Sequence, residues 1–149
     1  MIKWVTRGLL LVWIIVIFSF SNQNGEESSG ISDKVGARIV NLVDDLASMN
    51  WSIEEKNAAI AKIAYPIRKM AHMFEYAILA LLAYISFSNY VISIIIVFAN
   101  GAVDELHQLF IPGRAGRFTD VLIDTSGGVI MLLIVFIISL AVLRRKKYN

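Results

Sequence analysis

The chain contains no cysteine, and only two prolines and two histidines among its 149 residues. Without cysteine, disulfide bridges, thiolate catalysis and cysteine-ligated zinc are excluded. The sequence also lacks a glycine-rich phosphate loop and a basic patch interleaved with aromatic residues, so it gives no support for nucleic acid as a partner. Charged residues make up 17%, whereas hydrophobic residues make up 57% and the mean hydropathy is +0.66. This balance favours a single-domain integral membrane protein covering residues 1–149.

Four apolar segments are each long enough to cross the hydrocarbon core of a membrane. They cover about residues 4–20, 70–87, 90–110 and 121–143. The first segment could instead be a signal peptide, because Lys3 and Arg7 form a basic start, but residues 19–23 make a poor cleavage site. We therefore expect an all-α, integral membrane four-helix bundle.

Residues 22–69 connect the first two spans and contain two predicted amphipathic helices. Ser32 is the expected N-cap of a helix from Asp33 to about Met49, after a polar linker over residues 22–30. Ser52 and Glu55 form a capping-box pattern that opens the second helix. Pro66 is expected in the first turn of the following span. Both amphipathic helices are too polar to span, so we expect them on the membrane surface or capping the bundle.

Basic residues at both ends of the chain predict its orientation. Lys3 and Arg7 flank the first span, and residues 144–147 (RRKK) follow the last. The positive-inside rule places such flanks in the cytoplasm. Four spans put both termini on one side, so we expect both in the cytoplasm and the connection 22–69 outside. The RRKK run is most simply a topology anchor, and contact with anionic lipids is a second possibility.

Ionisable residues cluster within or beside the last three spans, although each charge on an isolated apolar helix opposes insertion by about 2.5–3.5 kcal/mol. With a helical rise of about 1.5 Å per residue, they converge on the outer third of the membrane. We expect them to form one outward-facing polar site. The candidate ligand-binding residues are Arg68, Lys69, His72, Glu75, Asp104, Glu105, His107, Gln108, Arg114, Arg117, Asp120 and Asp124.

Helical spacing groups these side chains on common faces. The polar face of the second span is formed by Lys69, His72, Glu75 and Tyr76. The third span presents Asp104, His107 and Gln108 together, whereas Glu105 is expected to point elsewhere. Arginine forks suit phosphate, so Arg114 and Arg117 could bind a phosphate or pyrophosphate head group.

Other interpretations of the polar residues stay open. They could pair only with one another as contacts between helices, without any ligand. A divalent metal could bind a nitrogen and oxygen set drawn from His72, Glu75, Asp104, Glu105, His107 and Asp124. That possibility is the weaker one, because neither HxxE nor DELHQ is the HExxH helix of zinc hydrolases. We expect no cofactor. Gly127 and Gly128 are expected to serve close helix packing.

Three sequence blocks resemble the VanZ-like family of small bacterial membrane proteins. They are residues 18–28 (FSFSNQNGEES), 68–76 (RKMAHMFEY) and 104–128 (DELHQLFIPGRAGRFTDVLIDTSGG), in that order. The first block departs from the usual FSxQ pattern at Phe20 and Asn22. The resemblance implies a multi-pass protein of the bacterial plasma membrane, associated with reduced susceptibility to teicoplanin. It assigns all the candidate residues except Arg117 to motif positions.

The expected function is binding or translocation of an anionic lipid or a lipid-linked cell-envelope precursor at the polar site. Lys69, Arg114 and Arg117 would contact the anion, while His72 and the carboxylates would orient them or relay protons. The alternative is an intramembrane, metal-assisted hydrolase or transferase acting on a lipid-linked substrate. A structural partner subunit without a ligand is a third possibility, and the sequence does not identify its protein partners.

Overall fold

The computed structural model describes residues 2–148, with side chains described for residues 3–145. Five helices form this part of the chain: α1 (Ile2–Ser21), α2 (Gly25–Ala47), α3 (Ile53–Phe87), α4 (Tyr90–Gln108) and α5 (Phe118–Tyr148). No strand occurs among these described residues. All helices except α2 are long and apolar enough to cross a membrane. The all-α fold with four candidate spans is therefore confirmed.

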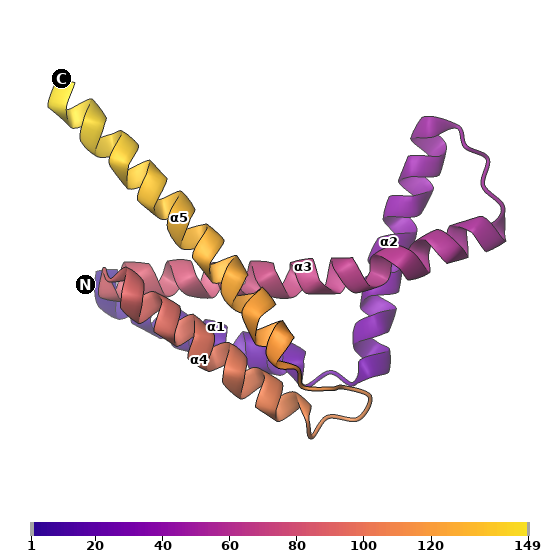
Figure 1. The fold of residues 1–149 in the computed structure, drawn as a ribbon, viewed down its shortest axis with the longest axis horizontal. Helices are drawn as coiled ribbons and strands as arrows, with labels where there is room; N and C mark the ends of the chain where they lie inside the picture. The colour runs from indigo at the N-terminus through magenta and orange to yellow at the C-terminus, as the bar shows by residue number, and fades with distance from the viewer. Residues whose placement is uncertain (1, 149) are drawn as a thin grey trace.

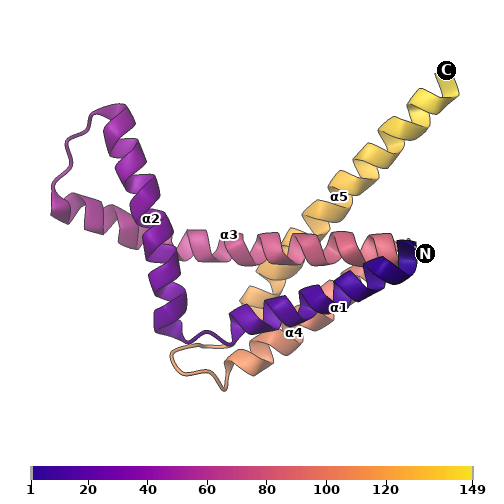
Figure 2. The same cartoon turned by 180° about the vertical axis from the view of Figure 1, so that it is seen from behind.

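Helix α3 is the centre of the fold, because α1, α2, α4 and α5 all pack against it. In both views α1 and α4 meet the C-terminal end of α3 and diverge from it towards the opposite end (Figures 1 and 2). Helix α2 crosses the N-terminal part of α3 at a steep angle. Helix α5 crosses α3 obliquely, and its C-terminal part extends beyond the other helices. The chain thus forms a wedge that is open at the end where α2 lies.

Small residues allow the helices to approach closely around a buried core. Tyr76, Leu79 and Ala80 of α3 form its centre, together with residues of α1, α4 and α5. A side-chain carbon on Gly127 would collide with the backbone of Met73. Small residues at helix contacts are typical of membrane bundles, where close backbone packing replaces the hydrophobic effect. Close packing at Gly127 is as predicted.

Helix α2 begins eight residues before the predicted start at Asp33. Its N-cap is Asn24, whose side-chain oxygen accepts a hydrogen bond from the backbone N–H of Glu27 at 2.8 Å. Ser32 is therefore not an N-cap but a buried residue within the helix. The predicted linker over residues 22–30 is mostly helical, because Asn24 satisfies a free N–H group and two acidic residues in the first turn favour the helix dipole.

The predicted boundary at Pro66 is absent, and one helix runs from Ile53 to Phe87. Ser52 and Glu55 form the predicted capping box at its start. Proline removes only one backbone donor, and spanning helices tolerate it when neighbouring helices pack around it. Pro66 itself is exposed, and α2 packs on the turns before it, where Gly36 faces Ile60 and Ile63. The second amphipathic segment and the second span are therefore a single continuous helix.

The remaining connections agree with the predictions to within a few residues. Ser88 and Asn89 alone link α3 to α4, and they cap the two helices. Helix α4 ends at Gln108, two residues before the predicted end, and α5 begins at Phe118, three residues before its predicted start. The loop between them, residues 109–117, lies at the same end of the molecule as the start of α2 (Figure 1).

Candidate functional site

Two neighbouring cavities, each of about 190 Å³, lie at the wide end of the wedge. The apolar-walled cavity is lined by Phe20, Gln23, Ser28, Ile31, Ser32, Val35, Ile67, Arg68, Ala71, His72, Glu75 and Arg114. The polar cavity is lined by Tyr65, Arg68, Lys69, His72, Glu105, Gln108, Gly113, Arg114, Ala115, Arg117, Asp120 and Asp124. Arg68, His72 and Arg114 line both, so they form the boundary between the two cavities.

Two arginines at this boundary have polar partners but no acidic one. Arg68 Nη2 donates to Ser29 Oγ at 2.7 Å, and Arg114 Nε donates to the backbone oxygen of Gln23 at 3.1 Å. Within residues 3–145, no carboxylate lies within ion-pair distance of either guanidinium. Arg68 Nε is buried and has no hydrogen-bond partner among the described residues. Positive charge at this point is therefore only partly compensated.

Burial, and then the nearby charge of Arg68, lower the pKa of Arg114. Arginine nevertheless stays cationic in proteins. Two like charges held close together in a partly buried site repel each other, and a bound anion would relieve that repulsion. An anion bound at the boundary between the cavities would therefore be stabilised by both arginines.

Of the other basic residues of the polar cavity, Lys69 is paired through its side chain and Arg117 is held through its backbone. Lys69 Nζ lies 2.6 Å from Asp120 Oδ2, in a pair whose side chains are 17% and 10% exposed. The backbone N–H of Arg117 donates to Glu105 Oε2 at 2.8 Å. These contacts connect α3 and α4 to the start of α5, so they also position the polar cavity.

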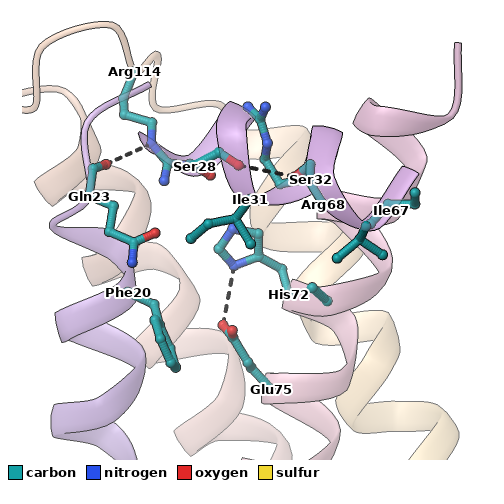
Figure 3. A pocket seen from close by; sticks show the side chains of 12 residues that line it. Phe20, Gln23, Ser28, Ile31, Ser32, Ile67, Arg68, His72, Glu75 and Arg114 are labelled. Carbon is teal, nitrogen blue, oxygen red and sulfur yellow. Dashed lines mark hydrogen bonds and ion pairs between the residues drawn. The ribbon is translucent and has the colours of Figure 1, made fainter. Parts of the chain in front are cut away.

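His72 lies beneath Arg114 and points into the apolar-walled cavity (Figure 3). Its Nδ1 atom is 3.4 Å from Glu75 Oε2, one helical turn along α3. That separation is an electrostatic contact rather than a well-directed hydrogen bond, and both atoms are buried without another partner among the described residues. The backbone oxygen of Glu75 accepts a hydrogen bond from Trp13 Nε1 at 2.9 Å. This bond ties the pair to α1.

Buried carboxylates lie behind the polar cavity. Asp104 is 1% exposed, and its Oδ2 atom accepts a hydrogen bond from Gln108 Nε2 at 3.1 Å. Gln108 Nε2 also lies 3.4 Å from Ser21 Oγ on α1. The Tyr76 hydroxyl and Asp104 Oδ1 are fully buried, and neither has a partner in the part of the chain that the structure describes. Asp124, 3% exposed, lines the polar cavity itself.

Two residues of α4 differ from the predicted arrangement. Glu105 does not point away from the cluster but lines the polar cavity, because the start of α5 packs on that side of α4. His107 instead faces α1, where its Nε2 atom lies 2.7 Å from Asn22 Oδ1 and its ring stacks on Phe18 at 4.4 Å. The structure therefore separates His107 from both cavities, while Asp104 and Gln108 remain together.

Among the described side chains, no three His, Asp or Glu residues are placed so that they could hold a metal ion. The two histidines, which would be the nitrogen ligands, lie in different places. His72 contacts Glu75 on its own helix, whereas His107 contacts α1. The six residues considered as metal ligands from the sequence thus do not form one set in this structure.

Helix α2 contributes cavity residues that the sequence analysis did not select. Ser28, Ile31 and Val35 line the apolar-walled cavity, and Ser29 holds Arg68. The sequence contains two features that could have predicted this helix. One is Asn24, a good N-cap, and the other is the spacing by four of the residues that the structure buries: Ser28, Ser32, Gly36, Val40 and Asp44. A repeat of four with small residues is typical of close helix contacts.

The start of α2 is joined to the loop that carries Arg114. The backbone N–H of Gly25 donates to the Pro112 oxygen at 3.2 Å, and Gly113, with a φ of +73°, packs against Gly25. A side chain on Gly25 would collide with the Gly113 backbone. Glycine at both positions therefore allows the contact that positions Arg114 beside Arg68.

A family model described as VanZ/LLP1 matches residues 8–139. The match covers α2, α3 and α4 in full, most of α1 and α5, and the residues that line both cavities. No curated protein and no solved structure matches the chain. The family assignment therefore rests on the sequence match over most of the chain.

Proposed function

The chain belongs to the VanZ/LLP1 family, and from this premise we propose that it binds the phosphate group of an anionic cell-envelope lipid or lipid-linked precursor. The bound phosphate lies at the boundary between the two cavities. Arg68 and Arg114 contact it, and His72 faces it from below. The teicoplanin association implied by the family resemblance is proposed to depend on this binding.

The observation that carries the proposal is the pair of arginines at the boundary. Both line both cavities, and neither has an ion-pair partner among the described residues. Arg68 has a buried, unpartnered N–H group. A phosphate accepts several charge-assisted hydrogen bonds from guanidinium groups and supplies the missing negative charge. Contacts between helices alone would leave these two charges only partly compensated.

The proposed roles differ from those expected from the sequence for two basic residues. Lys69 is paired with Asp120, so it positions α3 against α5 and is not a primary anion ligand. Arg117 stands at the polar cavity and meets whatever part of the head group extends beyond the phosphate. Arg68, rather than Lys69, becomes the partner of Arg114.

We further propose that the site opens to the outer side of the bacterial plasma membrane, with both termini in the cytoplasm. The basic flanks of α1 and α5 support this orientation. The loop 109–117 and the start of α2 then lie at the outer surface. Glycopeptide antibiotics and cell-wall precursors meet on that side, which would connect lipid binding to susceptibility.

Binding of phosphatidic acid and of a polyprenyl diphosphate to the purified protein in phosphatidylcholine nanodiscs tests the proposal. Arg114→Gln and Arg68→Gln should each weaken binding about tenfold or more, since a charge-assisted hydrogen-bond pair contributes about 1.5–3 kcal/mol. Arg38→Gln is the matched control, because Arg38 is an exposed arginine of α2 that lines neither cavity. Equal binding by all four proteins would refute the proposal.

The same variants should be compared for teicoplanin susceptibility at equal expression in cells. Arg114→Gln should abolish any protection given by the wild-type protein, and Arg38→Gln should keep it. Loss of lipid binding without a change in susceptibility would separate the binding site from the resistance association.

A further inference from the structure

The walls of the apolar-walled cavity are of two chemical kinds. Arg68, His72 and Arg114 line it and also face the polar cavity. Much of the remaining wall, which also includes Glu75, is formed by hydrocarbon side chains from three helices: Phe20, Ile31, Val35, Ile67 and Ala71. A ligand that matches both the cationic and the apolar side chains must be an amphiphile.

Three of these apolar residues form the rim through which the cavity opens. Phe20 is 45% exposed, Ile31 is 51% exposed and Val35 is 40% exposed, although all three line the cavity. They come from the end of α1 and the first half of α2. Phe20 lies at the end of α1, a candidate membrane span, so the rim begins beside the lipid phase, whereas Ile31 and Val35 belong to α2, which is not a candidate span. A soluble phosphate would gain nothing from such an opening.

The size of the cavities indicates how an amphiphile would be arranged. Each has a volume of about 190 Å³, below the roughly 300–1,000 Å³ of a pocket that encloses a complete small-molecule ligand. The shared boundary allows one ligand to occupy both cavities. Glu75 lies below His72 in the apolar-walled cavity and would repel a phosphate from that depth (Figure 3). The phosphate is thus kept at the arginines.

We propose, on the basis of the proposed function, that the apolar-walled cavity holds the first part of the hydrocarbon chain of the bound lipid. The chain passes over the rim formed by Phe20, Ile31 and Val35 and continues into the membrane. The phosphate stays between the two arginines, and a larger head group extends into the polar cavity. The lipid therefore enters sideways from the membrane, between α1 and α2.

A photoactivatable phosphatidic acid with a diazirine close to the carboxyl end of one acyl chain tests this placement. In phosphatidylcholine nanodiscs, irradiation should attach the probe to the wild-type protein at the segments that contain Phe20 and Ile31. Val35→Trp should reduce this attachment at least tenfold, because the indole fills the rim. Ile39→Trp is the matched control, since Ile39 lies one turn further along α2, is 43% exposed and does not line the cavity.

The outcomes separate this inference from the proposed function. If Arg114→Gln loses the attachment but Val35→Trp and Ile31→Trp, both folded by thermal unfolding, keep it, the chain lies elsewhere and only the inference fails. If Arg114→Gln and Arg68→Gln also keep it, phosphate binding itself is refuted. Attachment confined to the lipid-facing sides of α4 and α5 would likewise overturn the inference. If Val35→Trp does not fold, the result with Ile31→Trp decides.

Discussion

Lys69 Nζ and Asp120 Oδ2 lie 2.6 Å apart and join the middle of α3 to the first turn of α5. The pair stands at the edge of the polar cavity, and its side chains are only 17% and 10% exposed. Because Lys69 is neutralised by Asp120, it is not available to a ligand. The neighbouring Arg68 and Arg114 have no acidic partner among the described residues. The ion pair therefore determines which basic residues are available to a ligand.

Removing one member of this pair should destabilise the protein. Lys69→Met leaves a largely buried carboxylate without its partner, which we expect to cost about 2–3 kcal/mol, somewhat less than the loss for a fully buried pair. Asp120→Asn should have a similar effect. The double variant should recover most of the loss in thermal unfolding measurements in detergent. Additive losses in the double variant would contradict a direct interaction.

The close contact between α3 and α5 should be sensitive to a single methyl group. Gly127→Ala places a carbon against the Met73 backbone, so the helices must separate. Overpacking of this kind costs about 1–3 kcal/mol. Gly8→Ala in α1 is the control, because a side chain there meets nothing within 4 Å, and alanine favours a helix by roughly 0.5–1 kcal/mol. Equal melting temperatures for the two variants would contradict the packing.

Helical rise and the spacing of charges predicted that the polar residues would lie together at one end of the helices, and their depth in a membrane stays a prediction. Arg68, His72 and Asp124 indeed line cavities at one end of the molecule. The neighbours of each residue on other helices depend on the angles between the helices. The spacing of residues along the sequence does not predict these angles. His107 shares a predicted face with Asp104 but contacts Asn22, because α1 packs on that side of α4.

The start of α2 and the continuity of α3 differ from what residue preferences at Ser32 and Pro66 predicted. Ser32 is a good N-cap by residue type, yet Asn24 caps the helix earlier and Ser32 instead donates to the Ser28 oxygen at 3.1 Å. Pro66 is a typical boundary residue, but the chain stays helical across it, and α2 packs on the preceding turns of α3. The earlier start of α2 places Ser29 against Arg68 and makes Ser28, Ile31 and Val35 part of the cavity wall.

The proposed orientation predicts which residues react with reagents outside the cell. The chain has no cysteine, so single substitutions can be labelled without background. Ala115→Cys, exposed in the loop between α4 and α5, should react nearly completely with a membrane-impermeant maleimide in intact cells. Lys3→Cys should react only after the membrane is permeabilised. The reverse pattern would contradict an outward-facing site.

The contact between α2 and the start of α3 should weaken in acid. Hydrogen bonds from Lys56 and from the Trp51 backbone lower the pKa of Asp44 below its ordinary range. A lowered pKa in the folded state stabilises it above the unfolded value, about 3.9 for Asp, and this contribution is lost as the pH falls through the folded value. The protection of the Trp51 amide, measured as its exchange rate relative to the intrinsic rate at the same pH, should therefore decrease below about pH 4.

Asp44→Asn should show this loss of protection already at neutral pH. Asp45→Asn is the matched control, because Asp45 is the exposed neighbour on the same helix. If Asp44→Asn exchanged as slowly as the wild type at neutral pH, the carboxylate would have no role in holding the two helices together.

The lipids that co-purify with the protein test the central claim most directly. The wild type and Arg38→Gln are expressed at equal levels, and their bound lipids are identified by mass spectrometry after mild detergent extraction, alongside an Arg68→Gln/Arg114→Gln double variant. The account predicts that one class of phosphate-bearing lipid is retained by the first two proteins and reduced at least tenfold in the double variant. An identical set of lipids, in identical amounts, from all three proteins would contradict it.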